Sequence, residues 1–211
     1  REVISQYTSI VMITPSHLMY SWALAKRTEK TALEGPVKHR ATAFVIGALL
    51  PDIPVYVFFL VCGVLLGYGH EQLWDDMYFN SGWSVAFTLS HSLLLWPLLY
   101  LIAKYKQSFI AQWVAVSAIF HIVVDFCVHT ADAYAHFWPL TDWRFVSPIS
   151  YWDRAAYGQY VGCFDAALVL ALLWWLSTRY RESKLRFLIY VLLTLAALRF
   201  LMEFYSLLNY A

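Results

Sequence analysis

The sequence predicts an all-α protein, a polytopic transmembrane helix bundle of about six spans that forms a single domain over residues 1–211. Three observations lead to this prediction. Hydrophobic residues make up 61% of the chain and charged residues only 14%, whereas soluble domains contain about 45–50% and about 25%. Apolar stretches with the roughly 20 residues needed to cross a bilayer recur along the chain. They leave no room for a separate soluble domain.

Six stretches have the length and hydrophobicity of a membrane-spanning helix. They comprise residues 7–25, 41–67, 82–103, 109–128, 157–178 and 187–208, with a long outer loop at 129–156. Because proline removes a backbone hydrogen bond, we expect the second span to be kinked or broken between Pro51 and Pro54. A broken helix at membrane depth is tolerated where it lines a polar cavity, so this break points to a site.

The loops between these stretches differ in positive charge. Eleven of the fifteen Lys and Arg residues lie in the first, third and fifth loops, and the positive-inside rule places those loops in the cytoplasm. We therefore expect a multi-pass protein of a bacterial inner (cytoplasmic) membrane, surrounded by membrane lipids, with both termini in the periplasm. The net charge of +1 gives no indication of nucleic acid binding.

The first four apolar stretches each contain a histidine or an aspartate at membrane depth. These residues are His17, Asp52, His91, and the pair His121 and Asp125. An ionisable side chain at the centre of a bilayer costs about 2.5–3.5 kcal/mol, so such residues mark functional sites. At a rise of about 1.5 Å per residue, the three histidines lie roughly 10–15 Å below the outer surface. We therefore expect a polar cluster that opens toward the periplasm.

The chemistry of this cluster suits a metal ion. His121 and Asp125 are four residues apart and so share one face of a helix. Imidazole and carboxylate together suit zinc, which is the first choice, and also manganese or iron. The candidate metal ligands are His17, Asp52, His91, His121, Asp125 and His129. Asp52 and Asp125 are also the candidates for a catalytic role, as ligand or general base.

Simpler interpretations exist for the same residues. A histidine in a membrane helix can hydrogen-bond a neighbouring helix, and His121 and Asp125 can bond each other. Asp52 between two prolines can cap a helix start. The occurrence of four such elements at similar depth favours a ligand cluster over these interpretations.

The same residues also resemble a known family. The order along the chain is Pro15-Ser16-His17, Gly47-Ala48-Leu49-Leu50-Pro51-Asp52, Ser90-His91-Ser92, His121-x-x-x-Asp125 and Phe137-Trp138-Pro139-Leu140. It is similar to that of the bacterial inner-membrane metal-dependent hydrolases, including LexA-regulated members, over about residues 14–153. The resemblance implies a metal site and hydrolysis of a lipid-like or phosphate ester. The chain departs from the family at Leu89, where an Arg-x-x-Thr segment is common, and at Pro54, which replaces a second Asp.

The outer loop is longer than a connector requires. As a lid it would bring His129, Asp132 and His136 over the mouth of the site. As an interfacial loop it would be anchored by its aromatic residues instead. The sequence leaves both interpretations open.

The last two stretches contain three further charged residues. Arg199 and Glu203 lie one helical turn apart, which predicts a structural ion pair inside the bundle. Asp165 is expected either to pair with Arg199 across helices or to add to the polar cavity.

Four functions are compatible with these features, and the first is a metal-dependent membrane hydrolase. The second is a non-catalytic accessory subunit of a larger membrane protein complex that retains the hydrolase-like fold, which Pro54 and the large aromatic content favour. A haem-binding electron carrier would use two of the histidines but leaves Asp52 and Asp125 unexplained. A proton-coupled transporter is disfavoured because no internal repeat is evident.

Overall fold

The computed structural model describes residues 13–30 and 39–210, and every regular element within these ranges is helical. The α-helices are α2 (Ile13–Arg27), α3 (Arg40–Leu49), α4 (Ile53–Phe58), α5 (Tyr78–Asn80), α6 (Trp83–Ser90), α7 (Leu95–Tyr105), α8 (Phe109–Val128), α9 (Gly158–Arg179) and α10 (Ser183–Tyr210). Short 3-10 turns cover Thr28–Lys30, Leu50–Asp52 and Arg154–Ala156, and π-helical turns cover Phe59–Leu65 and Gln72–Met77. The all-α class is therefore confirmed for the described residues.

Four helical segments are long and apolar enough to cross a membrane. They are Arg40–Leu65, which runs from α3 through α4 into the following π turn, then α8, α9 and Ser183–Asn209 of α10. The bent pair of α6 and α7 makes a fifth if it counts as one span. The first predicted span, 7–25, lies partly outside the described residues, and α2 accounts for 15 residues. The total of six spans therefore stays a prediction.

The second span changes its hydrogen-bonding pattern at the two prolines. Pro51 and Pro54 have no amide hydrogen to donate, and the Ile53 amide bonds to the Leu50 carbonyl in the tighter 3-10 pattern. The helical segment nevertheless continues from Arg40 to Leu65. A break in this span is not confirmed, and the structure shows a local change of helix type that presents Asp52.

A bend with a measured angle lies between α6 and α7, where the helix axes turn by 54°. The outer loop satisfies the backbone at this bend. The Leu93 amide donates to the His136 carbonyl at 2.7 Å, and the Ser92 hydroxyl donates to the Trp138 carbonyl at 2.7 Å. Non-helical backbone at membrane depth needs partners of this kind. The loop therefore stabilises the bend that carries His91.

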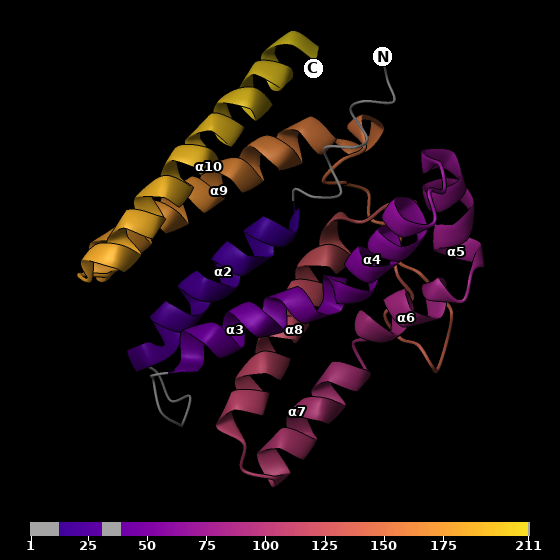
Figure 1. Ribbon diagram of the computed structural model, residues 1–211, viewed down its shortest axis with the longest axis horizontal. Coiled ribbons are helices and arrows are strands. Elements are labelled where there is room, and N and C mark those ends of the chain that lie inside the picture. The colour runs from indigo at the N-terminus through magenta and orange to yellow at the C-terminus, as the bar shows by residue number, and fades with distance from the viewer. Residues whose placement is uncertain (1–12, 31–38, 211) are drawn as a thin grey trace.

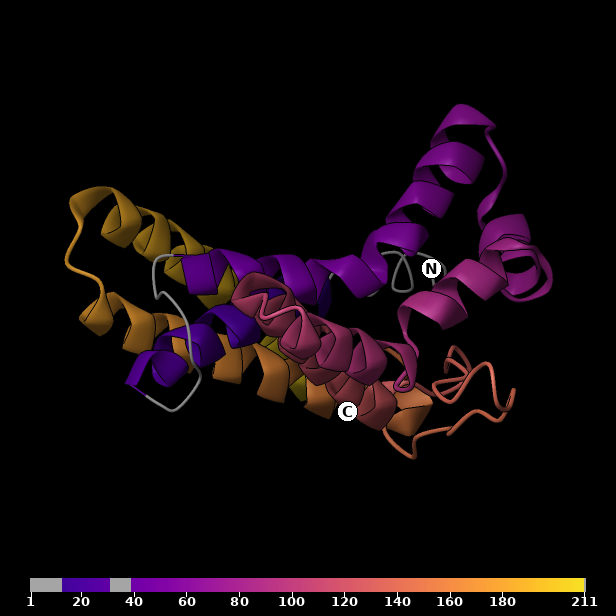
Figure 2. The same cartoon turned by 90° about the horizontal axis from the view of Figure 1, so that it is seen from below.

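The helices pack as a sequence of neighbouring pairs (Figure 1). α10 runs along α9, α2 packs between α9 and α3, and α3 crosses α8, which in turn pairs with α7. Turned by 90°, α4 and the chain that follows it rise away from this layer (Figure 2). The end of α6 and the outer loop meet α8 below α4, and this is where the polar side chains gather.

Candidate metal centre

Asp52, His91, His121 and Asp125 come together from three separate parts of the chain. Asp52 lies in the 3-10 turn after α3, His91 directly follows α6, and the other two lie one turn apart on α8. One ligand atom of each lies within 4.8 Å of the corresponding atoms of the other three. Both imidazoles and Asp125 are buried, and the Asp52 side chain is 17% exposed. This group has the composition and spacing to hold a metal ion.

The two carboxylates flank the same two imidazoles. Oδ2 of Asp125 lies 3.0 Å from Nε2 of His121 and 3.4 Å from Nε2 of His91. Oδ1 of Asp52 lies 3.5 Å from Nε2 of His121 and 3.6 Å from Nε2 of His91. The hydroxyl of Thr14 donates to the other oxygen of Asp52 and so fixes the orientation of that carboxylate. Each carboxylate thus directs one oxygen toward both rings.

Backbone carbonyls determine which nitrogen of each ring faces the carboxylates. Nδ1 of His121 lies 2.7 Å from the Ala48 carbonyl, and Nδ1 of His91 lies 2.9 Å from the Phe87 carbonyl. A carbonyl oxygen only accepts hydrogen bonds, so Nδ1 carries the proton in both rings. In a neutral ring, Nε2 then keeps its lone pair. Metal-ligating histidines in proteins are oriented in this way.

Several polar atoms of the cluster are buried without a hydrogen-bond partner in the described part of the chain. These are Nε2 of His17, Nε2 of His91, Nε2 of His121 and Oδ1 of Asp125. Each of these nitrogens lies 2.9–3.6 Å from a carboxylate oxygen, but none of them forms a hydrogen bond with it. Buried polar groups are almost always paired, and an unpaired one costs about 1–3 kcal/mol. A divalent cation fits this donor set because it would pair with nitrogen lone pairs and carboxylate oxygens together.

His17 and His129 approach the cluster from the other oxygen of Asp125. Nε2 of His17, on α2, lies 2.9 Å from Oδ1 of Asp125, and Nε2 of His129 lies 3.6 Å from the same atom. The His17 ring also stacks on His121, with ring centroids 3.9 Å apart. The six predicted residues are therefore neighbours, but the group whose ligand atoms lie close enough to share one ion contains four of them and does not include His17 or His129. Asp125 is the common contact, with two histidines on each oxygen.

The outer loop folds over this cluster. His129 and His136 are both buried, and Nδ1 of His129 lies 2.8 Å from Oδ2 of Asp132. Burial by itself lowers the pKa of His129, but the Asp132 and Asp125 carboxylates outweigh burial and raise that pKa well above its usual range. Burial likewise raises the pKa of Asp132, but His129 outweighs it and the net pKa is lowered. The two residues thus form an ion pair at the base of the loop.

His136 has the opposite electrostatic character. Burial lowers the pKa of His136 to about 4, so the ring is neutral at neutral pH. Its Nδ1 lies 2.9 Å from the His91 carbonyl and donates to it. The lid interpretation of the loop thus agrees with where the structure places His129, Asp132 and His136.

Asp132 is expected to tune the metal site without touching a metal. Its carboxylate contacts His129 and also accepts a hydrogen bond from the Trp152 indole at 3.1 Å. Asp132 acts through His129, which contacts the ligand Asp125. Loss of an outer partner typically costs about 10–100-fold in metal affinity, so Asp132→Asn should weaken zinc binding by about tenfold, at the low end of that range. Competition with a chelating dye measures this change. Asp142→Asn, on an exposed part of the same loop, is the control, and equal affinities for all three proteins would contradict the prediction.

Two residues of the site escaped the sequence prediction. Tyr134 stacks on His91, with ring centroids 3.8 Å apart, and its hydroxyl lies 2.8 Å from that of Tyr78. Nothing in the pattern around Tyr134 indicates this contact. Thr14, which binds Asp52, lies three residues before His17 and so shares its helix face. The three-residue spacing from His17 could therefore have identified Thr14 from the sequence.

The charged residues of the last two spans form a second, separate network. Arg199 forms an ion pair with Asp165, with 2.6 Å between Nη2 and Oδ2, and the hydroxyls of Ser16 and Tyr20 both donate to Asp165. Of the two alternatives predicted for Asp165, the structure therefore shows the ion pair with Arg199 across helices. Among the described ion pairs, Arg199 is joined to Asp165 and not to Glu203.

Comparisons with protein families, with curated proteins and with solved structures find no match for this chain. The resemblance to the inner-membrane metal-dependent hydrolases therefore stays a prediction from the motif residues. What the structure shows by itself is a chain with membrane-length apolar helices and a buried His/Asp group able to hold a metal ion.

Proposed function

We propose that this protein is a metal-dependent hydrolase of the bacterial inner membrane that cleaves a lipid-like or phosphate ester. One observation carries the proposal. His91 and His121 each donate Nδ1–H to a backbone carbonyl and direct an unpaired Nε2 toward the same two carboxylates. A plain hydrogen bond between histidine and aspartate would leave no such unpaired nitrogen. The motif order that resembles the hydrolase family supports the same function.

Asp52, His91, His121 and Asp125 would hold the cation, and zinc is proposed because nitrogen and oxygen ligands at this count suit it, with manganese or iron as alternatives. When bound, such a cation supplies a Lewis acid that polarises an ester or phosphoryl group. The protein supplies orientation. Asp125 is buried among four histidines and holds their rings in place.

Asp52 is the better placed of the two carboxylates for proton transfer. It is the most exposed member of the group, and the Thr14 hydroxyl holds one of its oxygens while the other faces the rings. A general base needs a fixed orientation and access to water, and Asp52 has both. We therefore assign proton removal from the attacking water to Asp52.

Metal analysis of the purified protein tests the proposal. The native protein should retain zinc, manganese or iron after dialysis, and His121→Ala should lose it, because the ring nitrogen that faces both carboxylates is removed. Unchanged metal content in His121→Ala would rule the site out. Hydrolysis of p-nitrophenyl octanoate and bis-p-nitrophenyl phosphate then tests catalysis, with Asp52→Asn expected to lose activity while it keeps part of its metal.

A second candidate function is a non-catalytic subunit of a larger membrane complex. Burial favours it, because His17, His91 and His121 are each at most 1% exposed. Pro54 also stands where the resembling family has a second carboxylate. Purification of a stoichiometric partner, together with absence of hydrolysis by the metal-loaded protein, would select this function over the hydrolase.

The proposed orientation places both termini in the periplasm and the metal centre toward the periplasmic side. Its support is the position of the basic residues. Lys26 and Arg27 end α2, Lys104 lies in the last turn of α7, and Arg179 ends α9. These helix ends would face the cytoplasm.

A further inference from the structure

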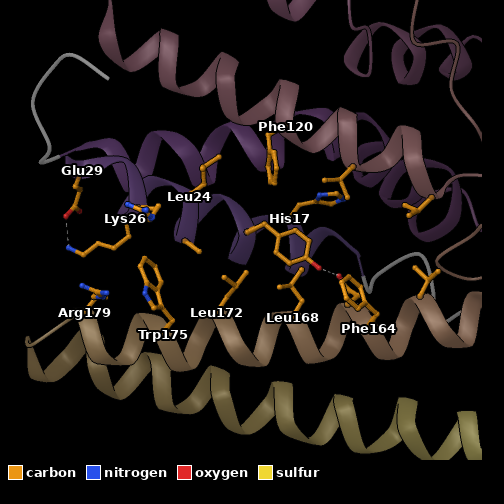
Figure 3. A pocket seen from close by; sticks show the side chains of 17 residues that line it. His17, Leu24, Lys26, Glu29, Phe120, Phe164, Leu168, Leu172, Trp175 and Arg179 are labelled. Atoms are coloured by element: carbon orange, nitrogen blue, oxygen red, sulfur yellow. Dashed lines mark hydrogen bonds and ion pairs between the residues drawn. The ribbon is translucent and has the colours of Figure 1, made fainter. Parts of the chain in front are cut away.

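A large cavity lies between α2, α8 and α9, next to the metal centre (Figure 3). Its volume is about 1090 Å³. Leu24 of α2, Phe120 of α8, and Leu168 and Leu172 of α9 form its apolar walls. The figure shows these side chains directed into the space between the helices. A cavity of this size and lining suits an apolar ligand.

The two ends of the cavity differ in chemistry. Lys26, Arg27 and Arg179 line one end, where α2 and α9 both terminate, and His17 lines the other. Lys26 is paired with Glu29 at 2.8 Å. Among the described residues at this end, Arg27 and Arg179 therefore remain as the uncompensated charges, and both side chains are exposed. The walls between the two ends are mainly apolar, and one mouth is positive. Tyr20 and Asp165 also line the cavity, but they are hydrogen-bonded to each other, and the Asp165 carboxylate is paired with Arg199.

The length of the cavity matches one leaflet of a bilayer. His17 and Lys26 are nine residues apart on α2, which corresponds to about 14 Å along the helix. The hydrocarbon core of a bilayer is about 30 Å thick, so one leaflet is roughly half of that. The basic mouth would therefore lie at the membrane surface, with the apolar walls at the depth of the acyl chains.

We propose that this cavity binds one anionic phospholipid, with an acyl chain between α2, α8 and α9 and its phosphate at Arg27 and Arg179. Charge selects the anionic headgroup, since each Lys or Arg near an anionic membrane surface contributes measurably to binding. The apolar walls favour binding of the acyl chain. The positive-inside pattern puts this mouth in the cytoplasmic leaflet, where anionic lipids are the expected partners.

The lipid site is distinct from the metal centre and does not depend on the proposed hydrolase activity. Asp52, His91, His121 and Asp125 do not line the cavity, and His17 forms the wall between the two sites. His17 contacts Asp125 on one side and the cavity on the other. A chain in the cavity would therefore reach the outer surface of the cluster without contacting its four central residues.

Native mass spectrometry of the full-length protein in detergent tests this site. The probes are dioleoyl phosphatidylglycerol and dioleoyl phosphatidylcholine, which share their chains and differ in headgroup charge. The protein should bind one phosphatidylglycerol in clear preference to phosphatidylcholine. Replacing Arg27 and Arg179 by Gln should reduce that preference by about fivefold for each charge removed. Leu168→Trp, which fills the cavity, should reduce the binding of both lipids.

Matched variants make the result specific. Arg181→Gln removes an exposed basic residue that does not line the cavity, and Leu195→Trp enlarges an exposed side chain on α10. Both should bind phosphatidylglycerol like the native protein. Equal binding of the two lipids by the native protein, or an equal loss in Arg181→Gln, would overturn the proposal. If Leu168→Trp does not fold, Leu172→Phe tests the same wall, and the charge variants remain decisive.

Discussion

Asp125→Asn is expected to abolish metal binding almost completely, with a larger effect than any other single change in the cluster. Asp125 is the common contact of four histidines, with His17 and His129 near one oxygen and His91 and His121 near the other. The substitution keeps the size and shape of the side chain but removes its negative charge. Loss of an outer partner costs about 10–100-fold in metal affinity, so loss of a shared direct ligand should cost at least about 100-fold.

Two comparisons separate this effect from general damage to the fold. Asp52→Asn should bind metal more weakly than the native protein but better than Asp125→Asn, because only one oxygen of Asp52 faces the rings. Asp142→Asn makes the same chemical change on an exposed residue and should bind like the native protein. Zinc affinity measured by chelator competition, together with helix content from circular dichroism, provides the test. Native affinity in Asp125→Asn would contradict the assignment of the cluster as a metal centre.

Hydrophobicity and helix geometry make much of this molecule predictable from sequence. The stretch 109–128 coincides with α8, and 157–178 differs from α9 by one residue at each end. Both are long uninterrupted apolar runs, and such runs can only be satisfied as helices in a bilayer. The spacing of His121 and Asp125 likewise predicts their shared face, because four residues make about one turn.

Tertiary contacts explain what the sequence does not reveal. The predicted stretch 82–103 reads as one apolar helix, yet the chain bends by 54° between α6 and α7. The bend depends on hydrogen bonds to His136 and Trp138, more than 40 residues away, and hydropathy carries no information about such partners. The prolines of the second span were a visible signal, and the structure shows a change of helix type there, while a break in the span stays a prediction.

The ligand set shows the same division between local and distant information. The free-energy cost of burying an ionisable side chain in a bilayer identifies His17, Asp52 and His91 individually as candidate ligands. It does not predict that the Ala48 and Phe87 carbonyls fix the orientation of the rings. The Ala48 contact depends on how closely α3 and α8 approach each other, which is decided by small residues at the crossing point. The Phe87 carbonyl lies four residues before His91 and depends on the local backbone where α6 ends.

Gly47→Ala is expected to have the second largest effect, because the backbone of α8 lies directly against α3 at this glycine. A Cβ atom added at Gly47 would lie 2.2 Å from the Val114 carbonyl oxygen and 2.8 Å from Cβ of Ser117. The nearest atom belongs to the backbone of α8, so it cannot rotate away and the helices must separate. Overpacking of this kind costs about 1–3 kcal/mol, which exceeds the helix propensity that alanine gains over glycine.

Separation of α3 and α8 would also reach the metal centre, because the residue after Gly47 supplies the carbonyl that accepts Nδ1–H of His121. Gly47→Ala should therefore lower both the thermal unfolding temperature in detergent and the zinc affinity. Gly82→Ala is the matched control, since a Cβ atom there meets nothing within 4 Å and both properties should stay native. A stable Gly47→Ala protein with native zinc affinity would show that the α3–α8 contact does not orient His121. A destabilised protein that still binds zinc normally would show that α8 alone, without the α3 contact, holds the His121 ring in its orientation.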